Sequence, residues 1–282
     1  MYQSPVGLVR WSTVTGTDTV DDNIEEQDVG FIGLGNMGAP MARTVRDAGF
    51  SVVAYDIRKG ILESFAAAGG ERAESPAALA ARCRSVHVVV QDDAQVRDVV
   101  DGESGVFAGF EESEGGTLVI HSTVHPDTCE AVAADAPADV AVVDAAMSGG
   151  QMGAESGELT LLVGGEDAIV EHCRPVFEAL SKMIFHVGPV GTGAVAKLAN
   201  NLTGIANIMT TAEGLRLGTA YDIDETVLLE IFGASSADSF IVQNCSFSQT
   251  RSVTPTRADS RDWRSLPPRT CILRWNWPGT PT

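Results

Sequence analysis

Three glycines near the start of the chain have the spacing of a phosphate-binding loop. Gly33, Gly35 and Gly38 follow the apolar run 29–32 in the pattern G-x-G-x-x-G. In this pattern the first glycine allows a tight turn, the second lets the backbone approach a diphosphate, and the third lets a helix pack closely on a strand. Asp56 lies 23 residues after Gly33, where an acidic side chain can accept hydrogen bonds from ribose hydroxyls. These residues predict a dinucleotide-binding site.

The elements that must position this loop alternate between strands and helices as far as Gly188. Apolar runs predict buried strands at 29–32, 51–55, 86–90, 117–120, 140–143 and 183–187. Helices are predicted between Gly38 and Gly49, up to Val100 after the third strand, and at 59–68, 75–82, 126–134 and 166–180. Repeated β-α-β units indicate an α/β fold with a Rossmann-type, doubly wound parallel sheet over residues 28–190.

The pattern changes after Gly188. Apolar residues recur at helical spacing from about 192 to 220 and predict one long helix, and a shorter helix is predicted at 224–232 with Asp224 as its N-cap. Residues 191–243 are therefore predicted to start an all-α second domain, which we expect to be truncated. Residues 1–27 show no periodicity and are predicted to form a disordered leader.

The composition of the 282 residues limits the classes of partner. The formal net charge of −19 repels nucleic acid and anionic membranes, and the apolar runs are too short to cross a bilayer. The five scattered cysteines fit a reducing compartment, and with no signal sequence we expect a cytoplasmic protein. His121 and His125 are four residues apart, but Pro126 breaks the helical geometry that one metal ion would need, so no metal is predicted.

The balance of charged residues also indicates the kind of cell from which the protein comes. Only three lysines occur, against 38 acidic residues. This composition resembles that of cytoplasmic proteins from salt-loving microbes, in which dissolved salt screens the repulsion between like charges.

Four motifs, in order, resemble those of the β-hydroxyacid dehydrogenases, typified by 3-hydroxyisobutyrate dehydrogenase and tartronate semialdehyde reductase. They are the glycine-rich segment 30–42 (GFIGLGNMGAPMA), the S-T-V motif 122–124, the segment 144–150 (DAAMSGG) and the segment 188–201, which ends in KLANN. The third motif differs from the family pattern because Ala146 and Met147 replace a proline and a valine. The resemblance covers about residues 28–240.

The resemblance implies hydride transfer between a nicotinamide cofactor and the hydroxyl carbon of a small 3-hydroxy carboxylic acid. Lys197 would exchange a proton with the substrate hydroxyl, and Asn201, four residues further along the same helix face, would hold that oxygen or the carboxylate. The substrate-binding residues that it implies are Ser122, Ser148, Gly149 and Gly150. The cofactor-binding residues that it implies are Gly33, Gly35, Asn36, Met37, Gly38, Asp56, Gln91 and Thr123.

Some of these residues also have purely structural interpretations. A lysine on an amphipathic helix is usually solvated, although Lys197 lies within the fourth motif and is one of only three lysines. Ser122 at a strand end is suited to cap the helix that follows. Asp144 is expected to support its loop rather than to act as an acid or base.

The choice between NAD and NADP depends on three residues. Asp56 favours NAD because its carboxylate repels a 2′-phosphate. Arg58 and Lys59 follow closely and could offset that repulsion for NADP. NAD is therefore the expected cofactor, with NADP as the alternative.

The last segment, 244–282, has an aberrant composition. Residues 245–282 carry six arginines and two acidic residues without helical periodicity, whereas family members continue with helices. The codons of Trp275, Asn276, Trp277 and Pro278, read from one base earlier, spell a helix-forming Glu-Leu-Ala, so a reading-frame shift is predicted. A genuine basic tail is the alternative. Family members have further helices in place of this segment. Without them we expect an apolar face to be exposed over 195–215. Because those helices form much of the subunit interface in the family, the homo-oligomer that the resemblance implies is doubtful here.

Other functions remain open at this stage. A semialdehyde or imine reductase would use the same fold, but the lysine at 197 favours alcohol chemistry. A catalytically inactive dinucleotide-binding product is the alternative from another class. 6-Phosphogluconate dehydrogenase needs a much longer helical domain and phosphate-binding basic residues, which this sequence lacks.

Overall fold

A computed structural model describes residues 28–244. The predicted disordered leader 1–27 and the tail 245–282, with its predicted reading-frame shift, lie outside the described residues. Asn244, which the sequence assigns to the tail, is the last residue of a short helix. Among the described residues, no helix is both long and apolar enough to cross a membrane.

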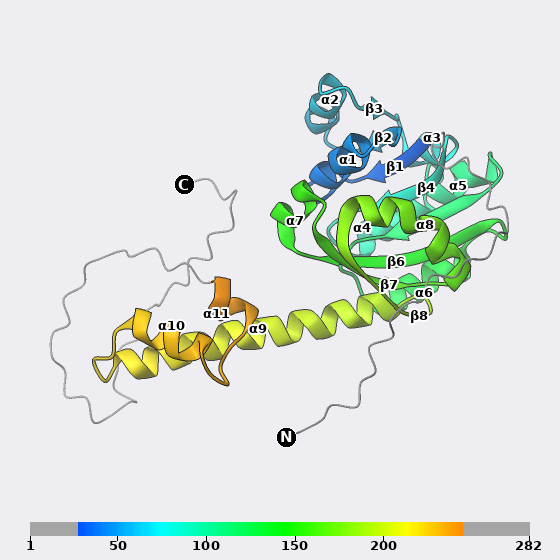
Figure 1. Ribbon diagram of the computed structural model, residues 1–282. Helices are drawn as coiled ribbons and strands as arrows, with labels where there is room; N and C mark the ends of the chain where they lie inside the picture. The colour runs from blue at the N-terminus through cyan, green and yellow to red at the C-terminus, as the bar shows by residue number, and fades with distance from the viewer. Residues whose placement is uncertain (1–27, 245–282) are drawn as a thin grey trace, which may run out of the picture.

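The first part of the molecule is one sheet with helices on both faces (Figure 1). Its strands lie in the order β3-β2-β1-β4-β5-β6-β7-β8. Their bounds are β1 Asp28–Ile32, β2 Val52–Tyr55, β3 Glu71–Arg72, β4 Cys83–Val88, β5 Gly116–Ile120, β6 Val140–Ser148, β7 Leu159–Gly164 and β8 Ser181–Gly188. The connecting helices are α1 Gly38–Asp47, α2 Lys59–Ala67, α3 Pro76–Ala80, α4 Asp93–Asp101, α5 Val106–Glu111, α6 Pro126–Asp135, α7 Gly150–Ser156 and α8 Asp167–Leu180.

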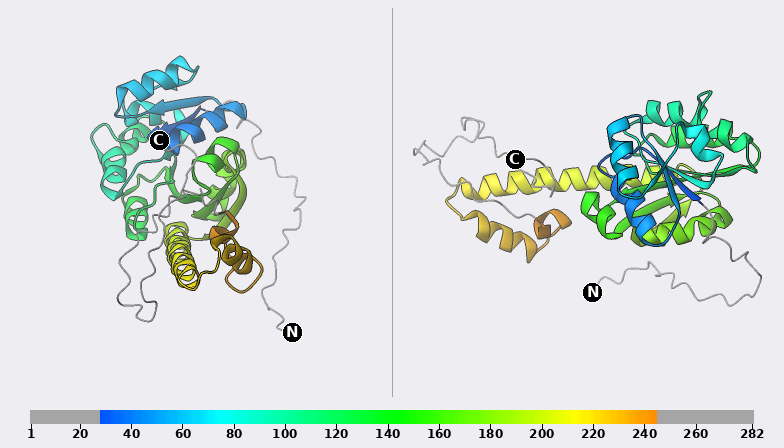
Figure 2. Two further views of the ribbon diagram at one scale, coloured as in Figure 1. Left: turned by 90° about the vertical axis from the view of Figure 1, so that its left-hand side faces the viewer. Right: turned by 90° about the horizontal axis from the view of Figure 1, so that it is seen from above.

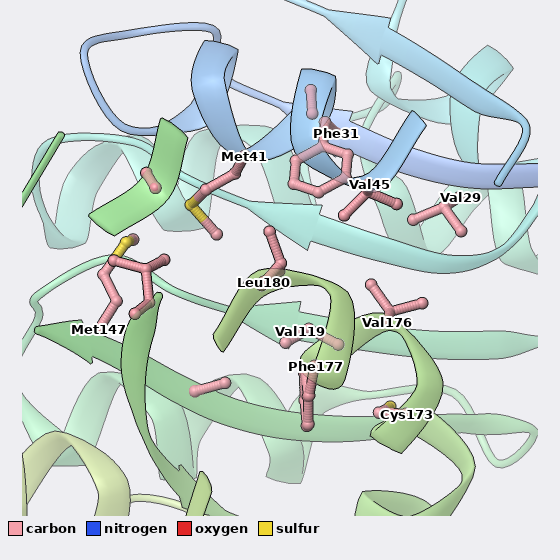
Figure 3. Close-up of a cluster of buried hydrophobic side chains, with 14 of the residues drawn as sticks. Val29, Phe31, Met41, Val45, Val119, Met147, Cys173, Val176, Phe177 and Leu180 are labelled. Carbon is pink, nitrogen blue, oxygen red and sulfur yellow. The ribbon is translucent and has the colours of Figure 1, made fainter. Parts of the chain in front are cut away.

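Successive side chains along each strand point to opposite faces of the sheet, so the sheet separates two hydrophobic cores. In β1, Phe31 belongs to the core that α1, α2 and α8 cover, whereas its neighbour Ile32 belongs to the core under α3 to α6. Figure 3 shows the first core, in which Met41 of α1 and Phe177 of α8 lie on the same side of the sheet as Phe31. Because both faces are covered there, the central strands β1, β4 and β5 are mostly buried, and this is why short apolar runs predicted them.

The sheet departs from the predicted parallel arrangement at its last two strands, β7 and β8, which run opposite to the other six. β7 is antiparallel to β6, with Ser148 opposite Thr160, and the remaining strand pairs are parallel. The strand predicted at 140–143 continues to Ser148, and the strand predicted at 86–90 ends at Val88. The elements β3, α5, α7, β7 and α11 have no predicted counterpart.

The second part of the described chain is built on one long helix. α9 spans Thr192–Thr219 and is followed by α10 (Glu225–Gly233) and α11 (Phe240–Asn244). The first two agree with the predicted helices, including Asp224, whose carboxylate accepts a hydrogen bond from Thr226 N at 2.8 Å. Figure 2 shows α9 projecting from the sheet, with α10 and α11 folded back along its far half. The first turns of α9 contact β6, β7 and β8.

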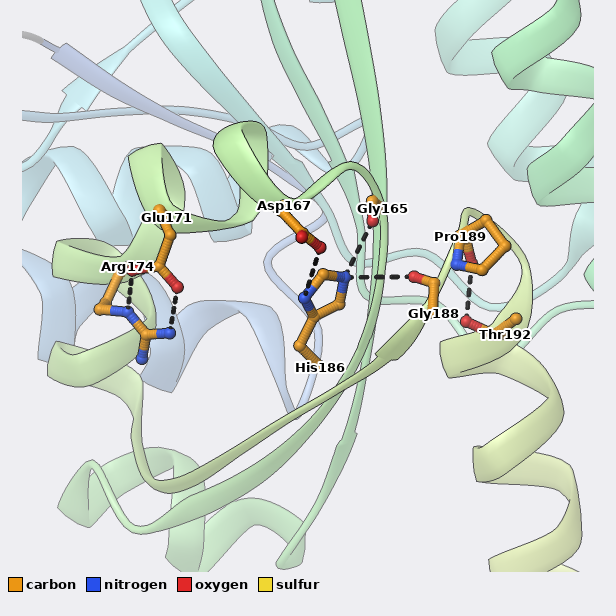
Figure 4. Close-up of polar contacts among 8 residues, drawn as sticks. All are labelled: Gly165, Asp167, Glu171, Arg174, His186, Gly188, Pro189 and Thr192. Atoms are coloured by element: carbon orange, nitrogen blue, oxygen red, sulfur yellow. Dashed lines mark hydrogen bonds and ion pairs between the residues drawn. The ribbon is translucent and has the colours of Figure 1, made fainter. Parts of the chain in front are cut away.

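A histidine holds the junction between the sheet and α9 (Figure 4). His186 Nε2 lies 2.8 Å from the carbonyl oxygen of Gly165 and 3.2 Å from that of Gly188, and its Nδ1 lies 3.6 Å from Asp167. Thr192 Oγ1 donates to the carbonyl oxygen of Pro189 at 2.6 Å. These bonds tie the turn after β7 to the end of β8, so the starting point of α9 is fixed to the sheet.

Candidate functional site

The glycine-rich loop after β1 has the conformation that its spacing predicts. Gly33 has φ +93°, and a Cβ at this residue would overlap the carbonyl oxygen of Val89. A Cβ at Gly38 would overlap the carbonyl oxygen of Gly33, so α1 can approach β1 only because residue 38 lacks a side chain. At Gly35 the nearest atom to a Cβ would be Arg58 Nη2 at 3.9 Å, which leaves the backbone there open to a ligand.

The start of α1 offers its positive end to an anion. Among the described residues, no side chain accepts a hydrogen bond from the N–H groups at the start of α1, and the first turn of this helix has no acidic residue. Asn36 is exposed, whereas Met37 is half-buried and packs against the core. An open glycine beside a free helix N-terminus fits a dinucleotide diphosphate. The residues present therefore fit the cofactor that the sequence predicts.

Asp56 lies at the end of β2, beside the glycine-rich loop, and is buried. Its Oδ2 accepts from Leu34 N at 2.7 Å, and its Oδ1 accepts from Arg58 N at 2.8 Å. The Arg58 guanidinium adds Nε to Oδ1 and Nη2 to Oδ2, each at 2.9 Å. Burial opposes ionisation of Asp56, but these donors outweigh it and lower the pKa of the carboxyl group.

The ends of β4 and β5 bring three further predicted residues to the same edge of the sheet. Ile32, Val88 and Ile120 are in register across β1, β4 and β5, so the chain leaves these strands side by side. Ser122 is buried and its Oγ accepts from Val90 N at 2.9 Å, so it links two strand ends rather than capping a helix. The other two predicted residues, Gln91 and Thr123, are exposed at this edge.

The predicted substrate loop lies beyond the end of β6. Ser148 is the last residue of β6 and is half-buried, and Gly149 and Gly150 follow with φ of +128° and +63°. Positive φ values at two consecutive residues favour glycine, and they turn the chain sharply from β6 into α7. The loop therefore presents backbone and a hydroxyl group rather than bulky side chains.

A carboxylate in the middle of β6 holds the start of α9. Asp144 is buried, and its two oxygens accept from Gly191 N and Ala194 N, each at 2.6 Å. Burial raises the pKa of Asp144, and these backbone donors oppose the rise. The sequence predicted that Asp144 supports its own loop. In the structure its carboxylate instead binds the start of α9, almost fifty residues later in the chain.

Lys197 and Asn201 lie in the second and third turns of α9 and are both half-buried. Burial lowers the pKa of the Lys197 ammonium. Among the described residues, no hydrogen bond joins either side chain to Ser122, Ser148 or the two glycines of the substrate loop. The structure thus joins Asp56 to the glycine-rich loop through Leu34, and it links α9 to the sheet through Asp144.

Sequence reasoning missed a pair of histidines beneath this edge. His87 Nδ1 lies 2.8 Å from His121 Nε2, and His121 Nδ1 lies 2.7 Å from the carbonyl oxygen of Ala145. Both rings are fully buried, and burial lowers the pKa of His121 to about 4 and that of His87 well below its usual value. A histidine within an apolar strand run is the only signal in the sequence for this pair.

Comparisons with known proteins agree with this geometry. Residues 28–188 match the NAD binding domain of 6-phosphogluconate dehydrogenase. Residues 191–259 match the NAD-binding domain of NADP-dependent 3-hydroxyisobutyrate dehydrogenase, so the second match continues past residue 244, where the sequence places the start of the tail.

Individual relatives cover most of the chain. An NAD-dependent L-serine dehydrogenase of Pseudomonas aeruginosa is 35% identical over 77% of this chain and 72% of its own length. A probable mitochondrial 3-hydroxyisobutyrate dehydrogenase of Dictyostelium discoideum is 36% identical over 84% of this chain and 72% of its own. The solved structure of Mycobacterium tuberculosis 3-hydroxyisobutyrate dehydrogenase with L-serine is 25% identical, with a TM-score of 0.71 over 77% of this chain and 74% of that one. The chain therefore belongs to the β-hydroxyacid dehydrogenase family of NAD(P)-dependent oxidoreductases.

Proposed function

We propose that the protein transfers a hydride between NAD(P) and the hydroxyl carbon of a small 3-hydroxy carboxylic acid, with Lys197 as the group that moves the hydroxyl proton. The observation that carries this proposal is the half-buried Lys197, on a helix whose first turn is bound to Asp144 in the sheet. A lysine with a lowered pKa exchanges protons more readily near neutral pH.

Each predicted residue has a place in this proposal. The bound cofactor would supply or accept the hydride. It would be held by Gly33, Gly35, Asn36, Met37, Gly38, Asp56, Gln91 and Thr123. The neutral Lys197 amine would accept the proton of the substrate hydroxyl during oxidation, and Asn201 would orient that oxygen. The substrate carboxylate would be held by the hydroxyl and backbone donors of Ser122, Ser148, Gly149 and Gly150.

Replacing Lys197 by methionine tests the proposal, because methionine keeps most of the length of the side chain but cannot carry a proton. With NAD and NADP and a panel of small 3-hydroxy acids, we expect Lys197→Met to lower kcat by about 10²- to 10⁴-fold and to leave cofactor affinity unchanged. The wild-type rate of oxidation should rise with pH, with an apparent pKa below 10.5, as expected for a lysine desolvated by burial.

Lys182→Met is the matched control, because Lys182 is exposed on β8 and should keep full activity. Equal activity in the two variants would refute the role of Lys197. Turnover of imines or semialdehydes without alcohol oxidation would favour a reductase of the same fold. Cofactor binding with no turnover on any of these substrates would identify a catalytically inactive dinucleotide-binding protein.

We further propose that the protein works in the cytoplasm of a salt-adapted cell. The net charge of −19 and the presence of only three lysines support this setting. A free energy of unfolding that is the same at low salt and in molar KCl would contradict it.

A further inference from the structure

The carboxylate of Asp56 has no free acceptor position in this structure. A carboxylate offers about four lone-pair sites, and Asp56 receives four N–H donors. Two come from the backbone at Leu34 and Arg58, and two come from the Arg58 guanidinium. An adenosine ribose cannot donate to Asp56 while all four donors stay in place.

The two guanidinium donors form a fork on the carboxylate. Nε donates to Oδ1 and Nη2 donates to Oδ2, each at 2.9 Å. The neighbouring 2′- and 3′-hydroxyls of a ribose present the same pattern, two adjacent donors for the two oxygens of one carboxylate. Arg58 therefore occupies the positions that the ribose of NAD would need.

The two side chains differ in how easily they can leave this pair. The Arg58 side chain is 55% exposed, whereas the Asp56 side chain is 3% exposed. The Arg58 guanidinium can therefore move into water, where it is hydrated, once other donors replace it on Asp56. Asp56 stays in place because the two backbone N–H groups continue to hold it.

We propose that Arg58 is a displaceable substitute for the ribose diol and sets the choice between NAD and NADP. When NAD binds, the diol replaces the guanidinium on Asp56. When NADP binds, the guanidinium stays, masks the Asp56 charge and donates to the 2′-phosphate from Nη1, for which the described residues supply no acceptor. Nη2 lies 3.9 Å from the position of a Cβ at Gly35, so the guanidinium lies at the cofactor loop.

This inference concerns cofactor binding and is separate from the proposed reaction at Lys197. Its test is the dissociation constant of each cofactor, measured by isothermal titration calorimetry on the full chain without substrate. Arg58→Ala removes the fork and keeps the backbone N–H that holds Asp56. We expect Arg58→Ala to bind NAD about 3- to 10-fold more tightly, because no side chain has to be displaced.

For NADP we expect the opposite effect. Arg58→Ala should weaken NADP binding by about 10- to 100-fold, the loss expected for a charge-assisted contact with the phosphate. Arg216→Ala is the matched control, because Arg216 carries the same charge on α9, well away from the glycine-rich loop, where it pairs only with Glu213 among the described residues. This control should change both constants by less than about threefold.

Arg58→Lys separates the charge from the fork, since lysine keeps the positive charge but cannot donate in parallel to both oxygens. Arg58→Lys should tighten NAD binding as Arg58→Ala does, and it should retain most of the affinity for NADP. If Arg58→Ala fails to fold, Arg58→Lys alone tests whether the fork on Asp56 opposes NAD binding. The proposal is overturned if Arg58→Ala weakens NAD and NADP equally, which would make Arg58 a general cofactor contact, or if it changes neither. It also fails if the wild-type chain binds neither cofactor, whereas binding without turnover would leave it standing and would count only against the reaction.

Discussion

Gly35 and Gly38 lie three residues apart in the cofactor loop but have opposite surroundings. A Cβ at Gly38 would overlap the carbonyl oxygen of Gly33, so this glycine is required for packing. A Cβ at Gly35 would point into open space, with Arg58 Nη2 the nearest atom at 3.9 Å. At the scale of single residues, one glycine is therefore required for packing, and the other leaves the backbone open to a ligand.

This difference predicts two separable effects of alanine substitution. Gly35→Ala should change the free energy of unfolding by less than about 0.5 kcal/mol and should weaken NAD(P) binding at least about tenfold, because its methyl group would occupy space at the diphosphate. Gly38→Ala should lower the free energy of unfolding by about 1–3 kcal/mol through overpacking. Urea unfolding and calorimetric titration measure both effects.

Gly60→Ala provides the control, because Gly60 lies within α2 and a Cβ at this residue would meet no neighbouring atom within 4 Å. This variant should be stabilised by about 0.5–1 kcal/mol, as expected for alanine in a helix. A normal cofactor affinity in Gly35→Ala would show that the diphosphate does not approach this residue.

The protonation of His87 and His121 follows from their partners. The carbonyl oxygen of Ala145 only accepts, so His121 Nδ1 carries the proton and its Nε2 accepts from His87 Nδ1. His87 Nε2 is then an unprotonated acceptor, and among the described residues it has no hydrogen-bond partner. Both rings are neutral, stacked on each other with centroids 5.1 Å apart.

This pair predicts a loss of stability in acid. The unfolded histidines titrate near 6.5, whereas burial lowers the pKa of His121 to about 4 and that of His87 well below its usual value. The unfolded state therefore binds more protons as the pH falls below about 6.5, and the free energy of unfolding should decrease by up to about 1.4 kcal/mol per pH unit for each histidine. Above about pH 7 the pair should contribute no pH dependence.

His87→Leu should remove about half of this acid dependence, measured as the free energy of unfolding between about pH 4 and pH 8. At the alkaline end it should cost about 1–3 kcal/mol, because His121 loses its donor. His172→Gln is the control, since His172 is exposed and should leave the curve unchanged. A slope in His87→Leu equal to that of the wild type would mean that other groups cause the acid dependence.

At the scale of elements, the sequence predicted what is encoded locally. Short apolar runs identified β1, β2, β4, β5 and β8, and Asp224 was identified as the N-cap of α10 because its partner is two residues away. The strand β7 was missed, and with it the reversed direction of β7 and β8, since apolar residues of the same kind suit a parallel or an antiparallel neighbour. The role of Asp144 was also beyond local patterns, because its partners are Gly191 and Ala194.

The bond between β6 and α9 makes a prediction about the helix that carries Lys197. Asp144→Ala would leave two buried N–H groups at the start of α9 without acceptors, which should cost about 2–4 kcal/mol in unfolding free energy. Hydrogen exchange should accelerate in the first turns of α9. Turnover should fall because Lys197 loses its fixed position, whereas NAD(P) affinity should stay within about threefold.

Asp224→Ala supplies the matched control for this loss of a cap. Asp224 caps α10 at an exposed position, so its removal should cost about 1 kcal/mol and leave turnover unchanged. If the Asp144 variant kept normal exchange in α9, the capping bonds would not be what positions the helix.

At the scale of the whole molecule, several large apolar side chains of the long helix α9 are exposed to solvent. Along α9, Leu202 is 73% exposed, Ile205 57% and Met209 64%, and these residues lie on one side at helical spacing. The exposed face predicted for 195–215 is therefore present, except that Leu215 is buried. Beyond it, Leu228 of α10 packs against Gly218 near the end of α9. β8 adds Met183, Phe185 and Val187, each more than two-fifths exposed on one face of the edge strand.

Exposed apolar residues on α9, in a chain with a net charge of −19, predict association that depends on salt. Charge repulsion should keep the chains apart at low ionic strength, and molar KCl should screen it and strengthen apolar contact, so sedimentation velocity should show larger species in about 2 M than in about 0.1 M KCl. Leu202→Glu with Ile205→Glu should abolish this increase. The exposed pair Thr203→Glu with Thr210→Glu adds the same two charges to the same helix and should leave most of it, since it spares the apolar residues. Equal suppression by both pairs would mean that net charge alone controls association, and the exposed face of α9 would then have no part in it.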